Sequence, residues 1–145
     1  MSKNRRPPDY GDRESRLRKA YERLGTNTPR CLICGQTNPL RLELHHPAQE
    51  DYDDETIILC SGDHDDASDW QKDHPDKIED PSSVIEIVAH WMFGLGDLLN
   101  IAASELEGAE LKELLSYTAA KLHALGHILI DLAKAAAQAK LEGAA

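Results

Sequence analysis

The sequence predicts a mainly α-helical protein that carries a small ββα module, and three observations predict this class. A Cys-x-x-Cys pair, two short strand-like stretches and a third cysteine follow one another within residues 31–60. A basic amphipathic segment precedes them, and two long heptad-patterned segments follow. We therefore expect a disordered arm over residues 1–11, a compact module with its N-terminal helix over residues 12–80, and an antiparallel helical hairpin over residues 81–145.

The N-terminal helix is expected over residues 12–24, after an arm rich in Pro, Arg and Asp. Its apolar side chains recur at i, i+3, i+4 and i+7, the spacing of one helix face: Leu17, Ala20, Tyr21 and Leu24. Basic side chains surround that face: Arg13, Arg16, Arg18, Lys19 and Arg23. They either meet a phosphate backbone or form an ordinary solvated surface.

The chain has three cysteines, at Cys31, Cys34 and Cys60. An odd number without an export signal argues against a disulfide framework and for metal binding. Cys31 and Cys34 flank a tight turn in which Gly35 can take the positive φ that closes a zinc knuckle. Zinc prefers four ligands, and either Asp63 or His64 can supply the fourth. The alternative is three ordinary buried thiols.

The rest of the module is expected to be two strands and a helix. Residues 41–45 alternate in polarity, and residues 56–59 are β-branched and apolar, so they can pair across the acidic loop at residues 50–55. Residues 63–72 contain neither Pro nor Gly and predict a helix, which ends near residues 74–75. The predicted order is knuckle, strand, loop, strand, helix.

Three histidines, His45, His46 and His64, form a second candidate site. Adjacent side chains at a strand end point to opposite sides, so one imidazole can hold a metal while the other faces a substrate. His64, at the start of the following helix, can return to join the first. An imidazole base and a cation are what phosphodiester hydrolysis needs near neutral pH. The alternative is that these are surface polar groups beside the knuckle.

Two further helices are expected after a helix-start signal at residues 80–83, with a polar break at residues 104–108. The first carries a heptad seam at Val84, Val88, Trp91, Leu95, Leu98 and Ala102. The second carries one at Leu111, Leu115, Thr118, Leu122, Leu125, Leu129, Leu132 and Ala136. We expect the seams to hold the helices together, and apolar residues off the seams to cover the module, the basic helix or a second subunit.

The formal net charge of −10 is distributed unevenly. Residues 1–50 carry 10 Lys and Arg against 6 Asp and Glu, whereas residues 51–145 carry 6 against 20. Nucleic-acid binding draws on clustered Lys and Arg, so the acidic remainder weakens non-specific attraction to phosphate. Charged residues interrupt the longest apolar stretches, and no apolar segment follows the N-terminus. We therefore expect no membrane span, no secretory signal and a cytoplasmic location.

The order of these motifs resembles the HNH endonuclease family. The resemblance lies in the Cys31-x-x-Cys34 pair, in Leu-Glu-Leu-His-His-Pro at residues 42–47, in Leu-Cys-Ser-Gly-Asp-His at residues 59–64 and in Ser-Asp-Trp-Gln-Lys-Asp-His-Pro at residues 68–75. It covers about 45 of the 145 residues and neither flank. It implies a ββα-metal fold, braced by zinc, that hydrolyses phosphodiester bonds.

Carried over residue by residue, the resemblance implies that His45 and His64 bind one catalytic Mg²⁺ or Mn²⁺ and that His46 is the base that activates water. Cys31, Cys34 and Cys60 become ligands of the structural zinc. Two positions depart from the family pattern. Asp63 stands where the fourth zinc cysteine is usual, and Glu55 stands near the usual central Asn, where it can orient the base or reach toward the metal.

We therefore expect a metal-dependent HNH-type endonuclease that acts on nucleic acid, with DNA preferred as the substrate class. The hairpin, over residues 84–140, is expected to form a homodimer or to dock on a protein complex that delivers the nucleic acid. The competing class is a non-catalytic zinc-binding adaptor with a degenerate HNH fold, whose hairpin binds a protein partner. The acidic charge and the two departures favour that class. His90, His123 and His127 are expected to be structural.

Overall fold

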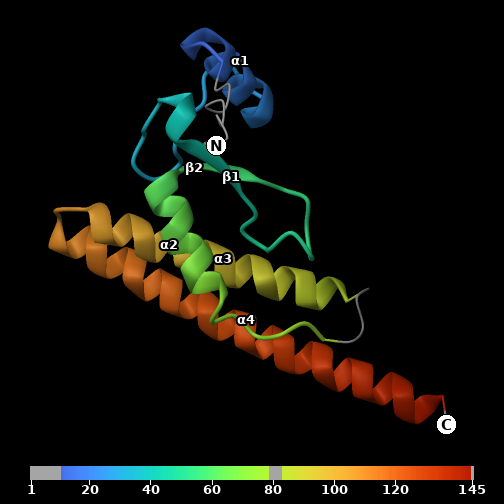
Figure 1. Ribbon diagram of the computed structural model, residues 1–145. Coiled ribbons are helices and arrows are strands. Elements are labelled where there is room, and N and C mark those ends of the chain that lie inside the picture. The colour runs from blue at the N-terminus through green and yellow to red at the C-terminus, as the bar shows by residue number, and fades with distance from the viewer. Residues whose placement is uncertain (1–10, 79–82, 145) are drawn as a thin grey trace, which may run out of the picture.

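A computed structural model gives the fold of the protein and describes residues 11–78 and 83–144 (Figure 1). The elements, in order, are α1 Arg13–Leu24, a 3₁₀ turn at Pro39–Arg41, β1 Leu42–His45, β2 Ile57–Cys60, α2 Ser61–Gln71, α3 Val84–Glu105 and α4 Ala109–Gly143. The predicted mainly α-helical class with a small two-stranded sheet is confirmed. The arm expected over residues 1–11 lies, except for its last residue, outside the described ranges, as does most of the helix-start signal at residues 80–83.

The two strands form an antiparallel pair in which Leu42 lies opposite Cys60 and His45 opposite Ile57. The first strand begins one residue later than predicted, because Arg41 closes the 3₁₀ turn. The helix α1 is capped by Asp12, whose carboxylate accepts from the Ser15 N–H at 2.7 Å.

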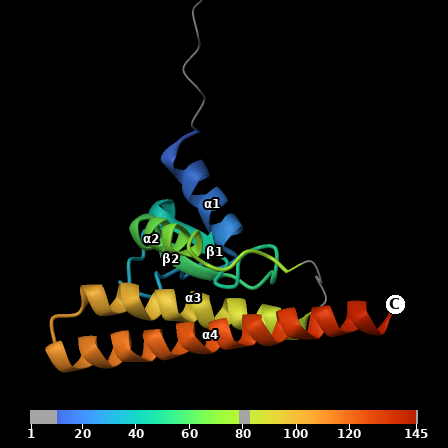
Figure 2. The same ribbon diagram turned by 90° about the horizontal axis from the view of Figure 1, so that it is seen from below.

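One apolar core joins the ββα module to the hairpin. Leu42 and Leu59 of the sheet and Ala67 of α2 are fully buried, and Leu98 and Ile101 of α3 belong to the same cluster. In Figure 1 and Figure 2, α2 and the sheet lie on one side of α3, while α4 runs antiparallel along another side of it. Helix α3 therefore completes the core of the module as well as pairing with α4.

The hairpin is present, but the predicted seam is wrong at several positions, although Leu98 is buried and Leu129 packs against the buried Ala89, Phe93 and Ile130. Val84 is 70% exposed and Leu132 is 53% exposed, although both were expected between the helices. The buried residues of α4 are instead Ala119, Gly126, Ile130 and Ala133. A methyl group on Gly126 would lie 2.7 Å from the Phe93 ring, so the small residue leaves the space that Phe93 fills. Close approach at small residues, rather than interdigitated leucines, holds this pair together.

Helix α3 also has the length and apolarity of a membrane-spanning helix, which the sequence analysis did not expect. Half of its most apolar window is buried inside the protein. A core helix of a soluble protein passes the same test, so the finding is weak evidence for a span.

Candidate metal centre and histidine site

The three cysteines and Asp63 lie together, although they come from three separate segments. Cys31 Sγ is 3.0 Å from Asp63 Oδ2, and Cys34 Sγ is 3.7 Å from Cys60 Sγ. The four ligand atoms all lie within 4.8 Å of one another. Gly35 has the predicted positive φ, at 75°, and its N–H donates to the Cys31 carbonyl to close the turn. The group can hold a metal ion, and three thiolates with one carboxylate suit zinc.

Burial changes the protonation of this group. It raises the pKa of the Cys60 thiol to about 12, and it raises the pKa of Cys31, where the hydrogen bond with Asp63 adds to the effect. Burial alone would also raise the pKa of Asp63, but hydrogen bonds with Cys31 and Cys60 lower it overall. A metal binds thiolates, so loading this site releases protons.

Asp63, rather than His64, completes the cysteine group. His64 follows it on the first turn of α2, and its ring meets the His45 ring edge to face with centroids 5.4 Å apart. Of the two ligands that the sequence left open for the zinc, the carboxylate is therefore the one beside the thiols. His64 stays with the histidine site.

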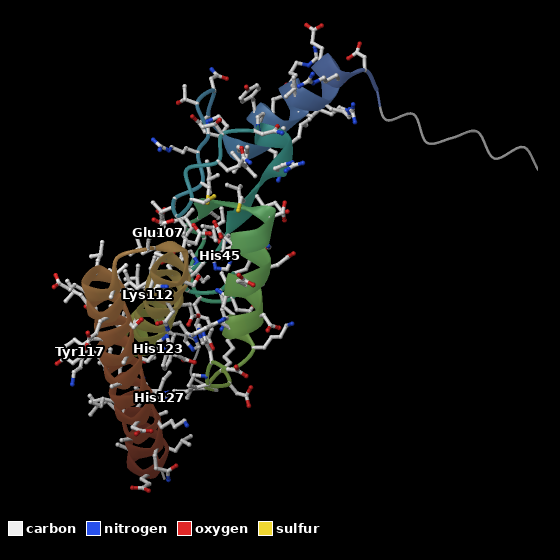
Figure 3. The ribbon with its side chains drawn as sticks, turned by 90° about the vertical axis from the view of Figure 1, so that its left-hand side faces the viewer. His45, Glu107, Lys112, Tyr117, His123 and His127 are labelled. Atoms are coloured by element: carbon white, nitrogen blue, oxygen red, sulfur yellow. The ribbon has the colours of Figure 1, made fainter. Side chains whose placement is uncertain are left out.

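The histidines line one open hollow of about 540 Å³. The helix α2 contributes His64, Ser68 and Gln71, which recur at i, i+4 and i+7 and so share one face. The lining residues are Leu44, His45, His46, Gln49, Glu50, Asp51, His64, Ser68, Gln71 and Lys72. Figure 3 labels His45, which lies between α2 and the hairpin.

Two of these imidazoles have a nitrogen suited to a cation. Burial, followed by the neighbouring His64 and His46, lowers the pKa of His45 to about 4, so the ring is neutral at pH 7. His64 Nδ1 is buried without a hydrogen-bond partner and lies 3.7 Å from Glu43 Oε2. Among the residues that the structure describes, the histidines do not form a three-ligand group within 4.8 Å. The two imidazoles supply the type of donor that a borderline divalent cation accepts.

The third imidazole, His46, is oriented by the loop that follows β1. Its Nδ1 lies 3.2 Å from the carbonyl oxygen of Asp53. A carbonyl oxygen only accepts, so Nδ1 carries the proton of the neutral ring. The other nitrogen, Nε2, is therefore the proton acceptor, which is the state that a general base requires.

Gln71, which the sequence analysis did not single out, fixes the same segment. Its side-chain N–H groups donate to the carbonyl of His46 at 2.7 Å and to the carbonyl of Pro47 at 3.3 Å, and they lie 3.3 Å from His45 Nε2. Only the i+7 spacing from His64 could have indicated it.

The orienting hydrogen bond expected from Glu55 comes instead from Asp53. Glu55 is exposed, and its backbone N–H donates to the Asp53 carboxylate at 2.9 Å. Glu55 is not among the residues that line the hollow. The expected role therefore passes to a backbone carbonyl two residues earlier.

Comparisons with known proteins add no relative. The chain matches no family model, no curated protein and no solved structure. The resemblance to HNH endonucleases rests on the motif residues, and a function must be argued from the arrangement of the site.

Proposed function

We propose that the protein is a small metal-dependent endonuclease of the HNH type, which hydrolyses phosphodiester bonds of nucleic acid. The observation that carries the proposal is the 3.2 Å hydrogen bond between His46 Nδ1 and the Asp53 carbonyl, because it assigns the proton to Nδ1 and leaves Nε2 as the acceptor on a residue that lines the hollow. His45 and His64 line the same hollow, and Asp63 of the cysteine group directly precedes His64 in the sequence.

In the proposed reaction His46 takes the proton of the attacking water through Nε2. His45 and His64 would hold a divalent cation, which when bound supplies positive charge to the scissile phosphate and the leaving oxygen. Imidazole ligands favour Mn²⁺ over Mg²⁺, because Mg²⁺ prefers an all-oxygen shell. The 2.7 Å hydrogen bond from Gln71 to the His46 carbonyl fixes the backbone of the base relative to the proposed ligands His45 and His64.

Substrate binding would draw on the exposed basic residues of α1: Arg13, Arg16, Arg18, Lys19 and Arg23. The hollow itself has acidic neighbours, Glu50 and Asp51, and one basic residue, Lys72. The protein's net charge of −10 opposes long-range attraction to nucleic acid. Delivery by a partner or assembly into an oligomer would compensate, with DNA as the first substrate to test.

The apolar outer face of the hairpin is the proposed oligomer surface, with a second copy of the chain as its occupant. Its exposed residues are Val84, Val88 and Leu95 of α3 and Leu111, Leu114, Leu125, Ile128 and Leu132 of α4. These eight residues come from both helices: on α3 they share a side of the helix with Trp91, and on α4 Leu114, Leu125, Ile128 and Leu132 lie opposite the buried Ala119, Gly126, Ile130 and Ala133. Being 38% to 70% exposed, they leave on the order of 700 Å² of apolar surface, close to the ~800 Å² that each partner buries in a standard interface.

Self-pairing is favoured because each chain carries an apolar helix face, and a second copy offers the same face to pack against. On α4 the exposed residues form two groups in which they are three or four apart, first Leu111 and Leu114 and then Leu125, Ile128 and Leu132, and this spacing packs against another helix. Two hairpins related by a two-fold axis would form a four-helix bundle.

A non-catalytic zinc-binding adaptor is the second candidate. The observation that favours it is the acidic rim, because Glu50 and Asp51 line the hollow where a phosphate would enter. In that case the zinc group and the hairpin would remain, and the histidines would serve no reaction.

Metal-dependent cleavage tests the proposed function. The purified full chain, checked to hold about one zinc per chain, is incubated with supercoiled plasmid or single-stranded DNA in Mn²⁺, in Mg²⁺ or in chelator. Cleavage that requires the added cation supports the proposal. The absence of cleavage of both substrates under every condition would favour the adaptor, and the absence of zinc would contradict the cysteine site.

A further inference from the structure

We propose that Trp91 of α3 is a positioning residue that fixes the His46 base through the loop residue Asp53, so that the hairpin forms part of the reaction site. The inference rests on the proposed function and deepens it. Trp91 is not among the residues that line the hollow, and it acts on His46 through Asp53.

The contact between Trp91 and the loop is a directed hydrogen bond. The indole N–H of Trp91 donates to Asp53 Oδ2 at 2.9 Å, while the other carboxylate oxygen accepts the Glu55 N–H at 2.9 Å. The Asp53 side chain is thus held from both sides. Its pKa is lowered, first by the Trp91 hydrogen bond and then by Glu55, so the acceptor stays ionised. An ionised acceptor makes the stronger hydrogen bond.

The same residue carries the carbonyl that selects the His46 tautomer. The backbone oxygen of Asp53 accepts from His46 Nδ1 at 3.2 Å. At 3.2 Å this hydrogen bond is at the long end of the usual range. A small shift of the loop would therefore weaken it, so it depends on how firmly the loop is held. Fixing the Asp53 side chain on α3 fixes its carbonyl, and the carbonyl fixes the proton on Nδ1.

Other contacts bring the rest of the loop to the same helix. A methyl group on Gly94 would overlap the carbonyl oxygen of Pro47, so the backbone that follows His46 lies directly on α3. Gln49 contacts His74 Nδ1 at 3.3 Å, and His74 donates from Nε2 to Asp97 of α3 at 2.7 Å. The loop therefore contacts α3 at Pro47, is linked to it through His74 at Gln49, and is hydrogen-bonded to it by Trp91 at Asp53.

The same buried carboxylate links the loop to α4. Asp97 also accepts from Nε2 of His123 at 3.0 Å. Figure 3 labels His123 and His127 on the side of α4 that faces the module. Both helices of the hairpin thus take part in the support on which the loop lies.

The direct test is the tautomer of His46 in the full chain, with Trp91→Phe compared with Trp70→Phe. The second variant changes the other tryptophan of the chain, which is 43% exposed on α2 and outside the hollow. Imidazole ¹⁵N spectra of zinc-loaded protein at pH 8 should show the Nδ1–H form of His46 in the parent and in Trp70→Phe. Trp91→Phe should shift it toward the Nε2–H form.

Two changes at Asp53 separate positioning from a general loss of structure. Asp53→Asn keeps an acceptor for the indole N–H and should retain the parental tautomer. Asp53→Ala removes the acceptor while leaving the backbone carbonyl, and it should match Trp91→Phe. In the DNA cleavage assay, Trp91→Phe should lower kcat by about tenfold or more and leave KM within about twofold.

The outcomes distinguish this inference from the proposed function. A parent that shows no cleavage but whose tautomer changes in Trp91→Phe would sink the nuclease proposal and leave the positioning role intact. A parent that cleaves DNA, with the same tautomer and kcat in Trp91→Phe, would overturn the positioning role and leave the nuclease proposal standing. An Nε2–H tautomer in the parent would overturn the inference directly.

Discussion

His90 is a buried histidine that the proposed reaction does not use. Its side chain is fully buried in α3, neither ring nitrogen has a hydrogen-bond partner, and the ring stacks on Tyr52 with centroids 3.8 Å apart. Burial, and then the nearby His74, lower its pKa to about 4. The folded protein therefore keeps this ring neutral at a pH where a solvated histidine is charged.

This predicts a pH dependence of stability that one substitution reduces. The unfolded histidine titrates near pH 6.5, so the unfolded chain binds more protons as the pH falls toward 4. Stability from the neutral ring is fully present above pH 6.5 and is lost below it. His90→Phe, measured by urea unfolding from pH 7 to pH 4.5, should remove about 2 kcal/mol of that loss.

His45 should account for part of the dependence that remains, because its pKa is also lowered to about 4. His127→Phe provides a matched control, because it makes the same substitution at an exposed histidine of α4, and His90→Phe should flatten the profile more than this control does. Parallel pH profiles for the parent and His90→Phe would show that His90 does not carry the effect.

Among single residues, the sequence predicts those that act through their side chains and stand at a characteristic spacing. Cys31, Cys34, Cys60 and Asp63 come together because the Cys-x-x-Cys turn and the strand-to-helix junction are local geometry. Asp53 could not be predicted, because its contribution is a backbone carbonyl that any residue has. Trp91 is 38 residues away from Asp53 along the chain, so only tertiary structure pairs them.

Helix α4 is the element whose packing face the sequence predicted least well. The heptad pattern correctly indicated two paired helices, but both faces of α4 carry such a pattern. Side-chain volume then decides which face packs, and Gly126 and Ala133 permit an approach that Leu125 and Leu132 would block. Periodicity alone does not contain that choice.

The contact between α3 and the module predicts an unusual response at Gly94. Replacing glycine by alanine inside a helix ordinarily stabilises it by ~1 kcal/mol. At Gly94 the new methyl would overlap the Pro47 carbonyl, so Gly94→Ala should destabilise the protein by about 1–3 kcal/mol in urea unfolding. Gly62→Ala is the control, because a methyl at this position in α2 meets nothing within 4 Å and should stabilise. A stabilised Gly94→Ala would mean that the module does not lie on α3 as described.

The whole molecule is a small module with a cysteine and aspartate cluster, packed on α3, which pairs with α4 (Figure 1). The exposed apolar residues of the hairpin form the face proposed for the dimer. Burying that face in a dimer would leave the hollow and the basic residues of α1 accessible. It would also place two candidate sites in one particle, which raises the effective concentration of a second site for a bound strand.

The proposed dimer predicts the mass of the protein in solution, and a double substitution in the apolar face should halve that mass. Sedimentation equilibrium of the parent should give twice the 16.1 kDa chain mass. Leu125→Glu combined with Ile128→Glu places two charges at the centre of the face and should give a monomer. Leu40→Glu alters a side chain that is 40% exposed on the module and should leave the dimer unchanged. A monomeric parent, or a double variant that remains dimeric, would rule out this surface.

The most direct test of the central claim is the rate of DNA cleavage with Mn²⁺ by the parent, His46→Ala and His127→Ala, at matched zinc content. His46 is the proposed base, whereas His127 is an exposed histidine of α4 that does not line the hollow. The account predicts that the parent and His127→Ala cleave at the same rate and that His46→Ala is slower by a factor of about 100 or more. A His46→Ala rate equal to the parental rate, or no cleavage by the parent, would contradict it.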